Sequence, residues 1–472
     1  MVRCNSSHVS LSVDDAREVE RYCQAKEYID KEIVRLTPRN STPERKVATA
    51  LGFNRQLGNP QAAYPSIQIA GTSGKGSVAY CLSLVLHAAG YSTGMHISPY
   101  LQVATEKSWV DGEYASGWEF SEACNAIREV TERHRFDLDG PASVHGMASL
   151  ALSYEIFRRR RIDVCVMETG LGGRFDLVQG LQRDLAVITD IGLDHTRALG
   201  EDRVSIAWHK AGIMAGAKRA VAVYDPEVWP VFVAESKSCG VPLRPIYPDE
   251  VVQLAPLDDG WLAHGALPNL GSFEIAVPAS WAGFPRRNLA VALVALDSLV
   301  ELGYRIEPEH CQAVTSSFFP GRMERIQESP RVTLDGAHNG QKMRALWNSL
   351  HPTGAPLVLL FGVTGMRKVE ELLGATGVVP HAIVLSRPDL YGKEVSNPEE
   401  LVSIARGFSP RVVVEPDVGN AVRAATELAA RVQGEVVVTG SLYLVGEARN
   451  HWYPWERVLL NRRSVWGCAQ NH

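Results

Sequence analysis

Short apolar runs alternate with longer amphipathic stretches along most of this chain. The runs Val164–Met167, Leu185–Thr189 and Ala220–Val223 consist mainly of valine, isoleucine, leucine and alanine. Stretches with helical spacing, such as Ser149–Arg159, lie between them. Strands of a parallel sheet are buried on both faces and show this continuous apolar pattern. The pattern therefore predicts an α/β fold whose parallel sheet is covered by helices on both sides.

The same alternation resumes in the last third of the chain and predicts a second, smaller α/β domain. The segment Phe319-Pro320-Gly321-Arg322 interrupts the pattern before an expected strand at Arg331–Leu334, so we place the boundary near residues 320–329. We predict a first domain over residues 1–320 and a second over 329–472. Prolines, glycines and alternating positions from about 241 to 281 predict a small antiparallel insertion in the first domain. Further strands of the second domain are expected at Leu357–Leu360, Ala382–Leu385, Val412–Val414 and Val436–Val438.

Composition narrows the class of protein. A chain of 472 residues needs more than one core, and 45% hydrophobic with 21% charged residues is typical of globular proteins. The net charge of -5, without a basic face, argues against a nucleic-acid partner. No apolar run has the length of a membrane-spanning helix, and the N-terminus lacks the regions of a signal peptide. The eight cysteines form no CxxC pair, so we expect free thiols and a cytoplasmic protein.

A glycine-rich turn is the first candidate for chemistry. The segment Gly71-Thr72-Ser73-Gly74-Lys75-Gly76-Ser77 lies between the apolar run Ser66–Ile69 and a helical pattern over Val78–Ala89. Glycines let backbone N–H groups approach an anion, a helix start favours negative charge, and Lys75 adds a cation. The strict P-loop pattern is not met, because Ile69 replaces its first glycine and Gly76 separates Lys75 from Ser77. By itself the segment indicates either a phosphate-binding loop or a tight structural turn.

Three further polar residues follow predicted strands or helices. Glu168 ends one apolar run, His195 follows the next, and Lys210 lies in a later helical segment. Ligands bind at the carboxyl edge of an open parallel sheet, which favours a shared site there. Each residue also has a structural interpretation: a helix-capping acid, a hydrogen-bonded histidine and a plain ion pair. Magnesium prefers oxygen ligands, so a histidine in its shell is unusual.

Taken in order along the chain, these motifs resemble those of the Mur ligase superfamily, most closely folylpolyglutamate synthase/dihydrofolate synthase. The resemblance covers roughly residues 60 to 450. It implies a P-loop-containing, Mur-ligase-like central domain with a parallel sheet and a smaller, Rossmann-like α/β C-terminal domain. The motifs that support it are Gly71–Ser77, Glu168–Arg174, Asp194–Thr196, Lys210–Ile213, Pro320–Arg322, Asp335–Asn339 and Thr439–Arg449.

The resemblance implies an ATP-dependent amide ligase. In that family the γ-phosphoryl group passes to a substrate carboxylate, and an amino acid amine then attacks the acyl phosphate. The cofactors implied are ATP and Mg²⁺, the partners are a carboxylate acceptor and an amino acid, with glutamate favoured, and the expected state is a monomer. Closure of the two domains over ATP would exclude water from the acyl phosphate.

The resemblance also assigns roles to individual residues. Lys75, Lys210 and His338 match catalytic positions, and Lys210 matches a lysine that is carbamylated in the family. The nucleotide would contact Gly71, Thr72, Gly74, Lys75, Gly76, Ser77, Asn288, Arg322 and Asp335. The metal positions are matched by Ser77, Ser98, Glu168 and His195.

Departures from the family pattern cluster on the acceptor side. Val144-His145-Gly146-Met147 replaces an aromatic and acidic patch that contacts the pterin in bacterial relatives, and Leu177–Gln179 also differs. Elsewhere Pro285 and Arg367-Lys368 replace family residues. Three interpretations follow: glutamate addition to folate, a diverged ligase acting on a non-folate carboxylate in specialised metabolism, and a non-catalytic ATP-binding homologue.

Overall fold

The computed structural model describes residues 10–33, 42–133, 141–258, 260–277, 286–316, 320–350, 354–365, 369–390 and 395–463. Pro285 and Arg367-Lys368 therefore lie outside the described residues. The chain divides into two compact units. The N-terminal unit comprises Arg17–Pro99 and Thr105–Ser317, and the C-terminal unit comprises Met1–Ala16, Tyr100–Ala104 and Phe318–His472. A single boundary at 320–329 did not predict that the short segment Tyr100–Ala104 belongs to the C-terminal unit.

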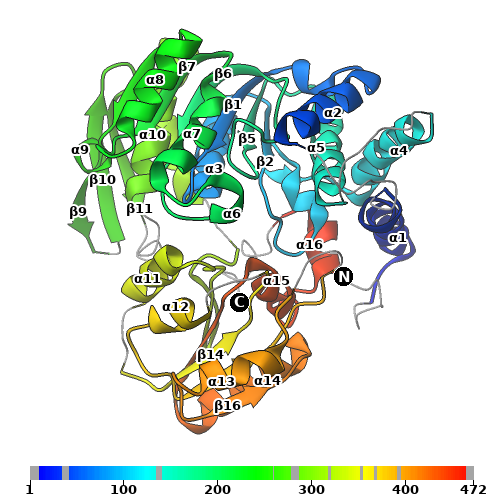
Figure 1. Ribbon diagram of the computed structural model, residues 1–472, viewed down its shortest axis with the longest axis vertical. Helices are drawn as coiled ribbons and strands as arrows, with labels where there is room; N and C mark the ends of the chain where they lie inside the picture. The colour runs from blue at the N-terminus through cyan, green and yellow to red at the C-terminus, as the bar shows by residue number, and fades with distance from the viewer. Residues whose placement is uncertain are drawn as a thin grey trace. The chain divides into compact units, whose positions relative to one another are not determined.

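An eight-stranded sheet forms the centre of the N-terminal unit (Figure 1). Its order is β4-β3-β2-β5-β1-β6-β7-β8, with parallel pairing from β2 to β8. Antiparallel pairing at β3 and β4 was not predicted, because strands of two residues leave no apolar run to detect. The strands are β1 (Pro65–Ala70), β2 (Thr93–His96), β3 (Trp109–Val110), β4 (Glu113–Tyr114), β5 (Val164–Glu168), β6 (Gln182–Ile188), β7 (Ala217–Val223) and β8 (Leu243–Ile246).

Helices cover both faces of this sheet, as predicted. On one face, Ile206 of α7 and Phe232 of α8 join a buried cluster with alternate residues of β6 and β7. On the other, α10 packs against α3 and against the same two strands. No helix of the described part of the chain is long and apolar enough to cross a membrane. The main helical segments are α1 (Val13–Glu27), η1 (Tyr28–Glu32), α2 (Pro43–Gln56), α3 (Lys75–Ala88), α4 (Gly117–Arg133), α5 (Pro141–Arg160), α6 (Thr196–Leu199), α7 (Arg203–Ala211), α8 (Trp229–Cys239), α9 (Pro248–Val251) and α10 (Arg286–Glu301).

The antiparallel insertion is present but shorter than predicted. It consists of β9 (Gln253–Leu257), β10 (Gly260–Leu267) and β11 (Gly271–Val277) in the order β11-β10-β9. The predicted start at 241 was wrong, because β8 pairs in parallel with β7 and belongs to the main sheet. β8 contains Pro245, so its sequence resembled the turn residues of the insertion and was not recognised as a strand.

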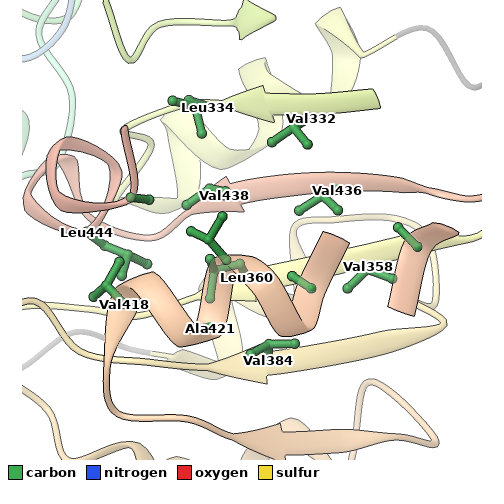
Figure 2. Close-up of a cluster of buried hydrophobic side chains, with 14 of the residues drawn as sticks. Val332, Leu334, Val358, Leu360, Val384, Val418, Ala421, Val436, Val438 and Leu444 are labelled. Atoms are coloured by element: carbon green, nitrogen blue, oxygen red, sulfur yellow. The ribbon is translucent and has the colours of Figure 1, made fainter. Parts of the chain in front are cut away.

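A six-stranded sheet with the order β12-β13-β17-β14-β15-β16 forms the C-terminal unit. All pairs are parallel except β12 with β13, and the four strands predicted after Leu334 are all present. Figure 2 shows one face of this sheet, where valines and leucines of four strands pack against α14 and Leu444. The elements are β12 (Glu324–Glu328), β13 (Arg331–Leu334), α11 (Gly340–Ser349), β14 (Leu357–Phe361), α12 (Val369–Gly374), β15 (Ala382–Leu385), α13 (Val402–Ala405), β16 (Val412–Val414), α14 (Val418–Arg431), β17 (Glu435–Thr439), α15 (Leu442–Arg449) and α16 (Trp455–Asn461).

The cysteines differ in one respect from the expectation of free thiols. Cys81, Cys124, Cys165, Cys239 and Cys311 are free, and all except Cys239 are buried. Cys23, in contrast, is disulfide-bonded, so the expectation was wrong for this residue. Sequence spacing does not detect such a bond, because it depends on the distance between Cα atoms in the fold.

Candidate active site

The glycine-rich turn joins β1 to α3 in a conformation that only glycine tolerates. Gly71 has φ +153° and Gly74 has φ +82°. A Cβ atom at Gly71 would lie 1.7 Å from Thr189 Oγ1, and one at Gly74 would lie 2.3 Å from Asn288 Oδ1. The turn is therefore packed against the residue after β6 and against the first turn of α10, which explains both glycines.

Hydrogen bonds fix the turn to the end of β6. The Thr72 N–H donates to the Asp190 carbonyl over 2.7 Å, and Thr189 Oγ1 donates to the Ser73 carbonyl over 2.6 Å. The helical ladder of α3 begins with the bond from the Val78 N–H to the Gly74 carbonyl. The N–H groups of Lys75, Gly76 and Ser77 precede that bond, so they have the position of orphan donors at a helix start. This arrangement suits an anion such as phosphate.

Two lysines converge on the same carbonyl of the turn. Lys75 Nζ donates to the Gly71 carbonyl over 3.1 Å, and Lys210 Nζ donates to it over 2.7 Å. Lys210 comes from the end of α7 and is 5% exposed. The start of α3 already favours anions, and the ammonium groups of Lys75 and Lys210 add to the positive charge there.

Glu168, the last residue of β5, balances part of this charge. Its Oε1 atom lies 3.8 Å from Lys75 Nζ, and its Oε2 atom accepts a hydrogen bond from the Ser98 N–H over 3.0 Å. A Cβ atom at Gly76 would lie 3.4 Å from Oε2, so the first turn of α3 faces the carboxylate. Since β1, β2 and β5 are neighbouring parallel strands, their carboxyl ends bring Lys75, Ser98 and Glu168 together.

His195 lies in a different environment from Glu168. It has φ +52°, precedes α6, and its side chain is half exposed, with Nε2 4.0 Å from Asp194 Oδ1. Within the described ranges, the structure assembles no group of three or more His, Cys, Asp or Glu side chains that could hold a metal. The metal set of Ser77, Ser98, Glu168 and His195 stays a prediction.

Asp176 is a buried acid that the sequence analysis did not assign to the site. Its carboxylate accepts the N–H groups of Leu171 over 2.6 Å and Val178 over 2.8 Å. Burial raises the pKa of Asp176, and these N–H groups together with Lys75 oppose that rise. Asp176 thus organises the glycine turn after Glu168. A buried acid within a glycine-rich segment was the available signal.

The glycine turn after Glu168 packs on the end of α7. The Arg174 N–H donates to the His209 carbonyl over 2.6 Å. A Cβ atom at Gly173 would lie 2.9 Å from the Lys210 carbonyl. The close approach explains why this turn and the helix that contains Lys210 belong to one site.

In the C-terminal unit, Asp335 lies at the carboxyl end of β13. Its two oxygens accept the N–H groups of Met323 over 2.9 Å and Ala337 over 2.8 Å. Burial raises the pKa of Asp335, and the nearby charge of Arg322 opposes the rise. A Cβ atom at Gly336 would lie 3.1 Å from Arg322 Nη1, so this arginine lies over the same turn.

His338 follows in the same turn. One ring nitrogen, Nδ1, lies 2.8 Å from the Gly336 carbonyl, and the other, Nε2, lies 3.0 Å from Lys342 Nζ. With Nδ1 donating to the carbonyl, Nε2 accepts from the lysine. Asn339 caps α11 by accepting the Lys342 N–H. The predicted residues Arg322, Asp335 and His338 therefore belong to one local arrangement.

An open apolar hollow of about 450 Å³ lies over α6, α7 and α8. None of the predicted site residues lines it. It is lined by Leu199, Gly200, Val204, Ser205, Trp208, His209 and Val231.

Comparison with known proteins identifies relatives of the whole chain. The family described as "Mur ligase, glutamate ligase domain" matches residues 321–442. A dihydrofolate synthase/folylpolyglutamate synthase of Mycobacterium tuberculosis is 30% identical over 83% of this chain and 87% of its own length. The Escherichia coli enzyme of the same name is 35% identical over 57% of this chain and 60% of its own length.

Solved structures are similar over nearly the whole chain. Mycobacterium tuberculosis folylpolyglutamate synthase complexed with ADP and AMPPCP has a TM-score of 0.78 at 27% identity, covering 92% of this chain and 99% of the other. Escherichia coli FolC in complex with DHPP and ADP has a TM-score of 0.74 at 25% identity, covering 94% and 98%.

Proposed function

This chain belongs to the Mur ligase family as a homologue of folylpolyglutamate synthase/dihydrofolate synthase, and from that premise we propose that it adds L-glutamate to a folate carboxylate. It is a folylpolyglutamate synthase-like, ATP-dependent glutamate ligase of the class that joins an acid to an amino acid. The observation that best supports the proposed site is the convergence of Lys75 and Lys210 on the Gly71 carbonyl, beside Glu168.

The first step transfers a phosphoryl group. A carboxylate oxygen of the acceptor bonds to the γ-phosphorus of ATP while the bond to the ADP oxygen breaks, which leaves an acyl phosphate and ADP. The N–H groups of Lys75, Gly76 and Ser77, with the Lys75 ammonium, hold the phosphate oxygens at the helix start. Such chemistry depends on positioning and on stabilising charge, which fixed backbone donors supply without reorganisation.

The second step forms the amide. The glutamate nitrogen attacks the acyl carbon, the carbon–oxygen bond to phosphate breaks, and the nitrogen loses a proton. We assign nucleotide contacts in the C-terminal unit to Arg322 and Asp335, and a catalytic position to His338. In the N-terminal unit Asn288, which faces Gly74, is the further nucleotide contact.

The residues around Glu168 fit a magnesium ion. Ser77, Ser98 and Glu168 offer hydroxyl and carboxylate oxygens, the ligand type that Mg²⁺ prefers, and His195 offers a less usual nitrogen. A bound Mg²⁺ would neutralise charge on the phosphate oxygens. The Ser98 N–H orients Glu168 for this role, since it holds Oε2 over 3.0 Å.

One observation favours a second candidate acceptor. Within the segment that replaces the pterin-contacting patch, Val144 and Met147 are 1% and 4% exposed, so these two side chains face the core. His145 instead contacts Asp30, with Nε2 3.1 Å from Oδ1. The segment therefore offers none of the aromatic side chains of the family's pterin-contacting patch, which favours a ligase acting on a non-folate carboxylate.

The deciding experiment measures ADP release with ATP, Mg²⁺ and L-glutamate. Tetrahydrofolate, dihydropteroate and no acceptor are compared, and mass spectrometry identifies the product. Glutamylated tetrahydrofolate is expected. If the enzyme turns over another carboxylate but releases no ADP with either pterin, the second candidate is favoured.

Lys75→Ala and Glu168→Ala should each abolish ADP release while the protein stays folded. Near wild-type turnover in either variant would contradict the assigned site.

A further inference from the structure

An ion pair at the edge of the phosphate turn has no part in the site described so far. Arg287, in the first turn of α10, donates from Nε to Asp190 Oδ1 over 2.7 Å. The two side chains are 46% and 25% exposed. Exposed ion pairs add little to stability because water and salt screen their charges, so stability alone gives little reason for this pair. Its position beside the turn indicates a role in binding.

Asp190 connects Arg287 to the phosphate turn. The backbone carbonyl of Asp190 accepts the Thr72 N–H over 2.7 Å, and the same residue pairs with Ser73 in an isolated antiparallel β-bridge. The carboxylate of Asp190 accepts the hydrogen bond from the guanidinium of Arg287. One residue thus bonds to the turn through its backbone and to the arginine through its side chain. This places the guanidinium beside the turn.

The next residue of α10 supports the same placement. A Cβ atom at Gly74 would lie 2.3 Å from Asn288 Oδ1, so the first turn of α10 contacts the glycine that precedes α3. Arg287 and Asn288 are consecutive, and they reach the turn at two points, one through Asp190 and one at Gly74. All of these residues belong to the N-terminal unit. The start of α10 therefore forms one side of the phosphate site within a single unit.

The charges of the pair suit a site for phosphate. Asp190 alone would place an anion beside a turn that favours anions, and like charges at short distance repel each other. Arg287 cancels that charge. An arginine remains protonated in proteins and presents five N–H donors in a planar fork. Among the residues that the structure describes, Arg287 makes its hydrogen bond through Nε, which leaves both Nη groups available for a ligand.

We propose that Arg287 is a further nucleotide-binding residue, whose two Nη groups donate to phosphate oxygens of ATP while Asp190 orients the guanidinium through Nε. The fork of an arginine matches two oxygens of one phosphate group, and such charge-assisted hydrogen bonds are roughly twice as strong as neutral ones. The proposal rests on the ligase function, because that function requires ATP at this turn.

Calorimetric titration with Mg²⁺ and AMPPCP, an ATP analogue that resists hydrolysis, tests Arg287→Ala against a matched control, Arg286→Ala. Arg286 precedes Arg287 in α10, carries the same charge and is 37% exposed, but it donates to the Asp249 carbonyl of α9. Both variants should melt within about 2 °C of wild type, because both lose a partly exposed side chain. Arg287→Ala should raise the Kd for AMPPCP tenfold or more, and Arg286→Ala less than twofold. Equal affinities in the two variants would overturn the proposal.

A double variant separates direct contact from the cancelling of charge. If Arg287 only cancels the charge of Asp190, then Arg287→Ala combined with Asp190→Asn should bind AMPPCP as tightly as wild type. Direct contact predicts instead that the double variant stays at least tenfold weaker. Arg287→Lys, which keeps the charge but lacks the fork, should lie between wild type and Arg287→Ala. Wild-type affinity in the double variant would overturn the proposal.

The titration also distinguishes the nucleotide from the other anion of the reaction, the acceptor carboxylate, because no acceptor is present. If Arg287→Ala binds AMPPCP as wild type does but has a raised KM for the acceptor, the arginine recognises the acceptor and the proposal is overturned. If wild type itself binds no AMPPCP, the proposed ligase function fails together with this proposal. If wild type binds and Arg287→Ala binds equally well, only the role of Arg287 fails.

Discussion

At the scale of single residues, the Lys210 side chain could act in two chemical forms, as an ammonium or as a carbamate. As an ammonium it donates to the Gly71 carbonyl over 2.7 Å and anchors the phosphate turn. As a carbamate it would present anionic oxygens beside the proposed metal residues. The two forms have opposite charges, so a variant without the side chain separates them.

Lys210→Ala should lower kcat by about 100-fold, because about 3 kcal/mol of stabilisation at the reacting phosphate is lost. If the carbamate is the active form, short carboxylates such as acetate should restore part of the rate. Lys210→Arg is the control, because arginine keeps the cation, cannot be carbamylated and fills the space. Activity of Lys210→Arg near wild type, without acetate, would contradict the carbamate.

His96 provides a prediction about acid stability. It is 3% exposed at the end of β2, with Nδ1 2.7 Å from Ser153 Oγ of α5. Burial, aided by Lys107, lowers the pKa of His96 from 6.5 to about 3. As the pH falls below about 6.5, His96 is protonated in the unfolded chain while it stays neutral in the folded one. The free energy of unfolding therefore falls between pH 6.5 and about pH 3.

The free energy of unfolding of wild type should fall, relative to His96→Asn, by about 1.4 kcal/mol per pH unit below pH 6. Asparagine stays neutral and keeps a partner for Ser153. Urea unfolding at pH 7, 6, 5 and 4 measures the difference. Parallel pH profiles for the two proteins would show that His96 is not the acid-sensitive group.

At the scale of elements, apolar runs located nearly every strand whose residues are buried on both faces. They did not locate β2, whose sequence Thr93-Gly94-Met95-His96 forms no apolar run although all four residues are buried. They also missed β3 and β4, which are two residues long, and β8, whose proline resembles a turn. The helical pattern placed the start of the helix after the turn at Val78, whereas α3 begins at Lys75. The difference arises because glycine and serine in a first helical turn have no apolar periodicity, and it matters because Lys75 belongs to the helix start.

Gly74→Ala should weaken ATP binding by tenfold or more. Its φ of +82° is unfavourable for alanine, and the new Cβ would meet Asn288 Oδ1. Gly90→Ala is the matched control, because its φ is +89° but nothing lies within 4 Å of the added atom. The backbone conformation should cost each variant about 1–2 kcal/mol of stability, and the contact with Asn288 adds to this cost in Gly74→Ala. Only Gly74→Ala should lose nucleotide affinity in calorimetric titration. Equal affinities would show that the approach to Asn288 is unimportant.

At the scale of the whole molecule, the two units have separate hydrophobic cores. One lies between β6, β7 and α7 in the N-terminal unit, and another between β13, β14, β17 and α14 in the C-terminal unit. Two cores allow unfolding in more than one step.

Scanning calorimetry should resolve two transitions. ADP at 100 times its Kd should stabilise the N-terminal unit, which contains the whole phosphate turn, by about 2.7 kcal/mol. Lys75→Ala should abolish the shift. A single transition in wild type, or an equal shift in Lys75→Ala, would contradict this prediction.

The α/β class, the family resemblance and the phosphate turn could be predicted from the order of residues alone. Burial on both strand faces and backbone positions that require glycine leave local patterns in the chain. Only the tertiary structure brought Lys210 to the Gly71 carbonyl, Ser98 to Glu168 and Gln102 to Arg449. These contacts join residues 139, 70 and 347 positions apart, and no local pattern encodes which distant groups share a buried charge. Asp176 became visible for the same reason, since a buried polar group is recognised by the partners that satisfy it.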